Sequence, residues 1–266
     1  MLSHHIFGEG FNSYQAVRLS MESEILRVAS SLFGGREVTT EKEVERIAIR
    51  AIFIALKERA LKLDAENLIG EIKESFLTEP ISLNSLHFSE RAELEGFVFC
   101  HTHTCKPSRE QFEDALYEYQ KSIRLLDNYQ TMKGVVRNFF KGYQERDGLI
   151  AEYAKGKYRY AVFFSLIDDL AEDLPHHLDF AEKYDGEYVV VTPTEDSIDP
   201  FLKFFKRHSE DAKKAGLKVW VVNTVDRTID PFIGYPRDFL LLKGFRNPKL
   251  ATMVNSWWRV SVEEID

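Results

Sequence analysis

The sequence predicts a mixed α/β fold, with a helix-rich first half and a second half built as a three-layer β-α-β-α-β sheet. Two observations lead to this prediction. In the first half, amphipathic helical periodicity dominates, and one short strand carries a His-x-His pair. In the second half, three nearly continuous apolar runs alternate with two segments of helical periodicity. The runs cover residues 158–166, 187–193 and 217–223, and the helical segments cover residues 170–184 and 198–215.

The three apolar runs are typical of strands that are buried on both faces. Their alternation with helices predicts a parallel or mixed sheet with right-handed crossovers. Gly216, directly after two lysines, is a typical helix end. Residues 227–258 are rich in proline, glycine and aromatic residues, and we expect them to be ordered because the aromatic side chains need to be buried.

The first half begins with two predicted helices. The first ends at Gly34-Gly35, which is a typical C-terminal signal. The second begins after Thr39-Thr40 with the pattern of a capping box, and we expect it to run to about Leu63. Its apolar residues follow the i, i+3, i+4, i+7 spacing of a helix face: Val44, Ile47, Ala48, Ala51, Ile52, Ala55 and Leu56.

A short strand and a further helix follow. Residues 97–103 begin at a glycine and combine aromatic with β-branched residues, which predicts a strand. The next helix covers residues 109–127, with Ser108 as its N-cap. Gln111 stands three residues later, as in a capping box.

The strongest signal for a domain boundary is the polar, glycine-containing stretch of residues 143–157. We therefore predict a helix-rich domain of residues 1–145, which carries the His-x-His pair, and an α/β domain of residues 146–266 with an aromatic-rich tail.

Composition limits the function classes. The net charge of −8 does not support nucleic-acid binding across the whole surface, although a local basic patch remains compatible with it. Two cysteines cannot form a disulfide framework, which indicates a reducing compartment. The N-terminal residues lack the pattern of a signal peptide, and no apolar run is long enough to span a membrane. We expect a cytoplasmic protein without membrane contact.

His101 and His103 carry the clearest chemical signal. Side chains two apart on a strand share one face, so both imidazoles could reach one metal ion. A tetrahedral zinc site needs one or two further ligands, and Cys105 and Asp114 are candidates if the strand stays extended. The alternative is that the histidines pack or hydrogen-bond at a strand end, and that Cys100 and Cys105 are small buried residues.

This stretch resembles the JAMM (MPN-plus) zinc metalloprotease motif. In that family His-x-His is followed by seven residues, a serine, two residues and an aspartate. Here His101, His103 and Ser108 match, but four residues replace the seven, and Gln111 stands at the aspartate position.

The resemblance implies a zinc ion on His101 and His103, with Asp114 or Cys105 replacing the aspartate. Ser108 would stabilise the oxyanion. Residues 63–70 resemble the segment that carries the family's glutamate, which implies Glu66 as the general base. The implied substrate is a protein or peptide, cleaved by isopeptidase or peptidase chemistry.

Two further resemblances compete. His-Thr-His-Thr is similar to the opening motif of the PHP phosphoesterases, which bind two or three metals. The layout of residues 158–223 resembles the core of PD-(D/E)xK nucleases, with Asp185 in the first acidic position. The segment Thr192-Pro193-Thr194 stands where those enzymes carry Glu-x-Lys. In open α/β sheets, ligands bind at the carboxyl ends of the strands, here residues 168–169, 192–196 and 223–226.

Three hypotheses follow. The first is a zinc-dependent hydrolase with an atypical site, in which the α/β half contributes substrate binding or homodimerisation. The second is a non-catalytic α/β protein that binds a ligand or a partner. The third is a nuclease-like protein that acts on nucleic acid.

Overall fold

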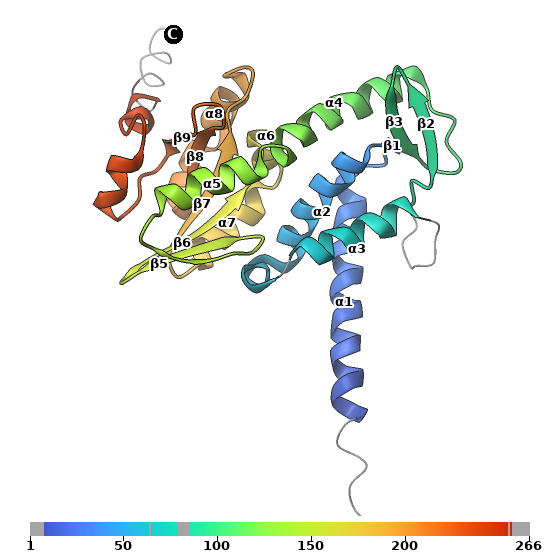
Figure 1. Ribbon diagram of the computed structural model, residues 1–266, viewed down its shortest axis with the longest axis horizontal. Helices are drawn as coiled ribbons and strands as arrows, with labels where there is room; N and C mark the ends of the chain where they lie inside the picture. The colour runs from blue at the N-terminus through green and yellow to red at the C-terminus, as the bar shows by residue number, and fades with distance from the viewer. Residues whose placement is uncertain (1–7, 64, 79–85, 255, 257–266) are drawn as a thin grey trace, which may run out of the picture. The chain divides into compact units, whose positions relative to one another are not determined.

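Figure 1 shows the computed structural model of the chain, which describes residues 8–63, 65–78, 86–254 and 256. The chain forms two compact units. The first comprises Met1–Lys57 and Asp64–Ser122, and the second comprises Glu58–Leu63 and Ile123–Asp266. The fold is mixed α/β, as predicted from the sequence. None of the helices in the described ranges has both the length and the apolar character that a membrane span requires.

The division between the units falls inside helix α4 (Arg109–Leu126), between Ser122 and Ile123. The boundary predicted between residues 145 and 146 lies within strand β4 (Gln144–Arg146). This strand pairs with β5 (Ala151–Lys155), so the polar stretch forms a hairpin of the second unit.

The first unit combines helices with a small antiparallel sheet, in the strand order β1-β3-β2. Phe33 lies at the centre of its helical core, with its ring centroid 5.2 Å from that of Phe76 and 4.9 Å from that of Phe88. The elements that precede α4 are α1 (Gly8–Leu32), β1 (Val38–Thr39), α2 (Glu41–Leu56), η1 (Lys57–Lys62), α3 (Ala65–Leu77), β2 (Glu90–Leu94) and β3 (Phe97–His101).

Helix α2 begins as its sequence predicts and ends earlier. The side chain of Thr40 accepts a hydrogen bond from the backbone N–H of Glu43, which caps the helix. The helix ends at Leu56 because Lys57 has φ 47° and ψ −116°, outside the helical region. Residues 57–62 continue as the 3-10 helix η1, so the predicted extent to about Leu63 is corrected.

A buried ionic cluster joins α2 to α4. Arg46 is 1% exposed, its Nε donates to Ser122 Oγ at 3.1 Å, and its guanidinium pairs with Glu118. Glu43 is also fully buried and pairs with Arg36. Burial raises the pKa of the Glu43 carboxyl, whereas the Arg36 charge lowers it.

The second unit is a six-stranded mixed sheet in the order β4-β5-β6-β7-β8-β9. Strands β6, β7 and β8 are parallel to one another, and the outer pairings are antiparallel. Its further elements are α5 (Tyr129–Phe139), β6 (Tyr158–Phe164), α6 (Ile167–Glu172), α7 (Leu174–Lys183), β7 (Glu187–Pro193), α8 (Asp199–Ala215), β8 (Lys218–Asn223), β9 (Thr228–Ile233) and η2 (Phe239–Gly244).

The two faces of this sheet are covered by different helices, which gives three layers (Figure 1). Helix α5 and η2 pack on one face, against alternate strand residues such as Val162, Val189 and Val222. Helices α6, α7 and α8 cover the other face, where Phe180 contacts Tyr188 with ring centroids 4.5 Å apart. Because both faces are covered, the central residues of all three parallel strands are mostly apolar, which is why the sequence predicts these strands well.

The segment after β9 is held to the sheet by buried polar contacts. The carboxylate of Glu187 accepts hydrogen bonds from the backbone N–H of Arg237 at 3.0 and 3.1 Å. Asp238 accepts from the Tyr143 hydroxyl and caps η2 by accepting from Leu240 N at 3.0 Å. These contacts fix the part of the predicted tail around Arg237 and Asp238, whereas residues 255, 257 and 258 of that tail lie outside the described residues.

Candidate functional site

The two histidines of the His-x-His pair do not share one strand face. Strand β3 ends at His101, because the chain turns and the N–H of Cys105 donates to the carbonyl of Thr102 at 3.1 Å. The predicted strand over residues 97–103 is therefore corrected at its end. His101 Nδ1 lies 3.0 Å from the Thr102 carbonyl, and His103 is 85% exposed with Nδ1 3.2 Å from Glu90 Oε1.

Ser108 and Gln111 form the capping box that the sequence predicts. Ser108 Oγ accepts from the N–H of Gln111 at 3.2 Å, and Gln111 Oε1 accepts from the N–H of Ser108 at 2.9 Å. Cys105 Sγ lies 3.9 Å from the same Gln111 oxygen. The glutamine at the aspartate position of the resembling motif thus fixes the start of α4.

The other predicted site residues lie apart from this turn. Glu66 is exposed in the first turn of α3, and Asp114 is exposed on α4. Within the described part of the chain, no three His, Cys, Asp or Glu side chains gather in an arrangement that could hold a metal ion. The predicted donors are not assembled to fit zinc, and zinc binding stays a prediction from the sequence.

The acidic position of the nuclease resemblance is a surface residue. The side chain of Asp185 is 99% exposed and lies 3.4 Å from Arg159. At the neighbouring strand ends, Glu195 pairs with Arg124, and Asn223 Oδ1 accepts from the N–H of Asp226 at 2.9 Å. The polar groups that the sequence places at the carboxyl ends of β7 and β8 therefore hold loops in place.

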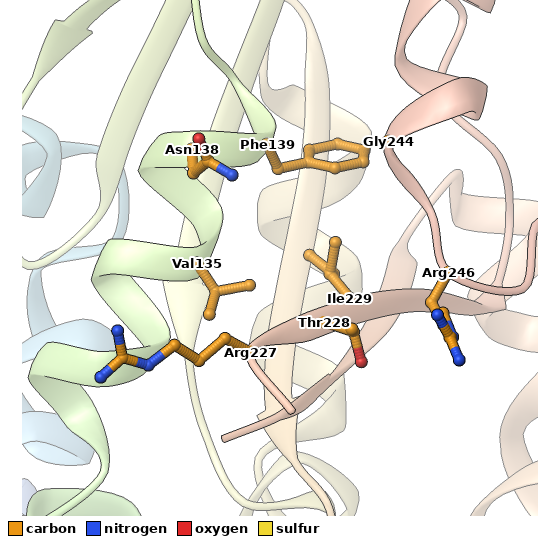
Figure 2. Close-up of a pocket in the computed structure, with 8 residues that line it drawn as sticks. All are labelled: Val135, Asn138, Phe139, Arg227, Thr228, Ile229, Gly244 and Arg246. Atoms are coloured by element: carbon orange, nitrogen blue, oxygen red, sulfur yellow. The ribbon is translucent and has the colours of Figure 1, made fainter. Parts of the chain in front are cut away.

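A pocket of about 210 Å³ lies between α5 and the edge strand β9 (Figure 2). It lies beside the carboxyl end of β8, because Thr228 pairs with Asn223. The residues that line it are Val135, Asn138, Phe139, Arg227, Thr228, Ile229, Gly244 and Arg246. The second unit alone supplies all of them.

The pocket combines an apolar wall with two cations. Val135, Phe139 and Ile229 are buried, whereas Arg227 and Arg246 are exposed. Neither guanidinium forms an ion pair with any residue that the structure describes. The arrangement can therefore bind an anion through charge-assisted hydrogen bonds while its apolar part contacts the wall.

Backbone contacts fix the rim on which Arg246 stands. The N–H of Arg246 donates to the carbonyl of Ile229 at 3.1 Å, and the N–H of Asn247 donates to the Asp230 carboxylate. Burial raises the pKa of the Asp230 carboxyl, and the Asn247 hydrogen bond and the Arg246 charge lower it. The pocket rim is thus tied to strand β9.

Sequence reasoning missed both arginines. The general rule for α/β sheets directed attention to residues 223–226, and Arg227 is the next residue in the chain. Arg246 could not be found in this way, because its position depends on the return of the chain after η2 to β9.

Two family models match the chain. Residues 24–117 match the family described as "Domain of unknown function (DUF6846)". Residues 118–247 match the one described as "Domain of unknown function (DUF6834), C-terminal domain", and this range contains every residue that lines the pocket. No curated protein matches the chain.

Proposed function

We propose that the chain is a non-catalytic α/β binding protein, and that its second unit takes a small anionic ligand in the pocket between α5 and β9. One observation carries the proposal: two arginines without ion-pair partners among the described residues flank an apolar-walled pocket at the edge of an α/β sheet. The pocket also lies beside the carboxyl end of β8, and open α/β sheets bind ligands at the carboxyl ends of their strands.

The lining residues support a ligand that is both small and anionic. A volume of about 210 Å³ lies below the range of roughly 300–1,000 Å³ that is usual for drug-sized ligands. Guanidinium groups pair with carboxylates and phosphates through two parallel hydrogen bonds. Asn138 and Thr228 add an amide and a hydroxyl that could orient the ligand.

The same lining supports binding rather than hydrolysis. It contains no histidine, cysteine, aspartate or glutamate, and its one hydroxyl belongs to Thr228. A nucleophile needs a neighbouring base, and general acid–base chemistry needs a titratable group within hydrogen-bond reach. The lining therefore has groups to hold an anion and none to activate a water.

Binding is tested with a panel of small carboxylates and phosphate monoesters, first by the shift in melting temperature and then by calorimetry. We expect a ligand that binds the folded state to raise the melting temperature with concentration. Replacing both cations in R227A/R246A should lower its affinity at least about tenfold, which is about 1.4 kcal/mol.

The matched control is R207A, which removes an exposed arginine of α8 in the same unit. This variant should bind like the unchanged protein. Equal affinity of the double variant and the unchanged protein would show that the anion binds elsewhere, and the proposal would then fail.

A further inference from the structure

The two arginines of the pocket reach it from separate segments of the chain. Arg227 belongs to the turn between β8 and β9, where it takes φ 54°. Arg246 follows η2 and is held by its backbone bond to Ile229. Figure 2 shows the side chain of Arg227 extended toward α5, whereas Arg246 lies on the opposite side of Thr228. The two positive charges therefore lie at two ends of the pocket.

Two apolar side chains, Val135 and Ile229, line the pocket together with the arginines. Both side chains are buried, and in Figure 2 Val135 from α5 lies beside the Arg227 side chain, whereas Ile229 from β9 lies between the two arginines. Methylene groups placed against these side chains would be removed from water, which favours binding. A single compact anion could pair with one end and would leave the wall uncovered.

We propose that the ligand is a short dicarboxylic acid, with one carboxylate at Arg227, the other at Arg246, and its carbon chain along Val135 and Ile229. This inference rests on the proposed function of the pocket. It adds that the ligand carries two negative charges and that a carbon chain separates them. A carboxylate suits the site because the pocket is small and each end offers one guanidinium fork.

The test compares matched acids that differ only in the second carboxylate: butanoate with succinate, hexanoate with adipate, and octanoate with suberate. Calorimetry at constant ionic strength gives the affinity of each acid for the full-length chain. We expect at least one dicarboxylate to bind about tenfold or more tightly than its monocarboxylate partner, because a second charge-assisted pair forms.

Variants that lack one of the two arginines then test whether each arginine binds one carboxylate. In R227A and in R246A, the dicarboxylate should lose its advantage over the monocarboxylate to within about twofold, because only one cation remains. The affinity for the monocarboxylate should fall by no more than about twofold, since the other arginine still receives it. R207A should preserve the advantage of the dicarboxylate.

Two results would overturn the inference alone while leaving anion binding in place. One is equal affinity for every matched pair of acids. The other is loss of monocarboxylate binding in either single variant, which would show that both arginines converge on one anion. If none of these acids binds but another anion of the panel does, the dicarboxylate assignment fails. If no anion binds at all, the proposed function fails with it.

Discussion

Arg46 shows how much a single buried charge contributes to the first unit. Its guanidinium is almost fully buried, and Glu118 and Ser122 of α4 receive its hydrogen bonds. Without Arg46, Glu118 keeps only the more distant cations of Arg36 and Lys121, at 3.7 and 3.4 Å, and Ser122 loses its donor in a poorly solvated site. The cluster therefore fixes the C-terminal part of α4 in the first unit to α2.

The substitution R46M keeps most of the apolar stem and removes the charge. We expect the free energy of unfolding of the first unit to fall by about 3 kcal/mol, measured by urea denaturation. The matched control is R109M, because Arg109 pairs with Glu113 at the surface, where both side chains are more than half exposed. The control should change stability by less than about 1 kcal/mol, and a loss as large as that of R46M would contradict the account.

Gln111 marks the limit of what sequence alone could predict about the candidate metal site. Gln111 belongs to two sequence patterns. The capping box depends only on neighbouring residues, whereas the metal motif needs ligands from distant parts of the chain. The capping box is confirmed, since it depends only on residues three apart on one helix. Whether Glu66 and Asp114 approach the histidines depends on tertiary packing, which no spacing along the chain encodes.

Strand β3 shows why element ends were harder to predict than element types. Its aromatic and β-branched residues continue the strand pattern, yet pairing stops at His101, opposite Val38 and Glu90. The N–H of Thr102 donates instead to the carbonyl of Glu37, outside the ladder. Strand β1, the shorter of the two strands that pair with β3, has only two residues. A strand this short leaves no recognisable pattern in the sequence.

Element packing beside the pocket depends on Gly244 at the end of η2. A Cβ at this residue would lie 2.8 and 2.9 Å from two atoms of the Phe139 ring. That ring cannot move freely, because it is packed against Trp220 and Phe245 with centroids 5.3 and 4.7 Å away. The glycine therefore allows η2 to approach α5 closely.

We expect G244A to destabilise the second unit by about 1–3 kcal/mol through overpacking, as measured by urea denaturation. The matched control is G134A in α5, where a Cβ would meet nothing within 4 Å. The control should stabilise the helix by about 0.5–1 kcal/mol, because alanine is the better helix former. A neutral or stabilising effect of G244A would show that the Phe139 ring can move to make room for the added methyl group.

At the scale of the whole molecule, the fold class was predictable and the division into units was not. The parallel strands β6, β7 and β8 are long apolar runs, because both faces of the sheet are covered. The division between units lies inside the continuous helix α4, where no change of composition marks it.

The tyrosines of the second unit make a prediction about alkaline stability. Burial raises the pKa of five phenols above the ordinary value of about 10: Tyr143, Tyr153, Tyr160, Tyr184 and Tyr188. Above pH of about 10, the unfolded chain loses these protons while the folded chain keeps them. Their contribution to stability is thus complete below pH of about 10 and declines as pH rises above it.

Urea denaturation at a series of alkaline pH values measures this decline, which should approach about 1.4 kcal/mol per pH unit for each phenol that ionises only on unfolding. Y188F removes a fully buried hydroxyl, so the decline of stability with pH should become shallower by the contribution of one phenol. An unchanged slope in Y188F would show that Tyr188 ionises in the folded protein.

The 3-10 helix η1 has a consequence for the order in which the chain can fold during synthesis. Glu58–Leu63, which include all of η1 except Lys57, belong to the second unit, although both flanking segments belong to the first. The first unit has all of its residues once Ser122 has left the ribosome. Residues 58–63 instead lie against Gly148, where a Cβ would be 3.6 Å from the carbonyl oxygens of Leu61 and Leu63, and Gly148 is made later. A nascent chain therefore carries one early piece of its second unit without its packing partner until Gly148 has been made. A fragment that begins at residue 118 or 123 would lack that piece permanently.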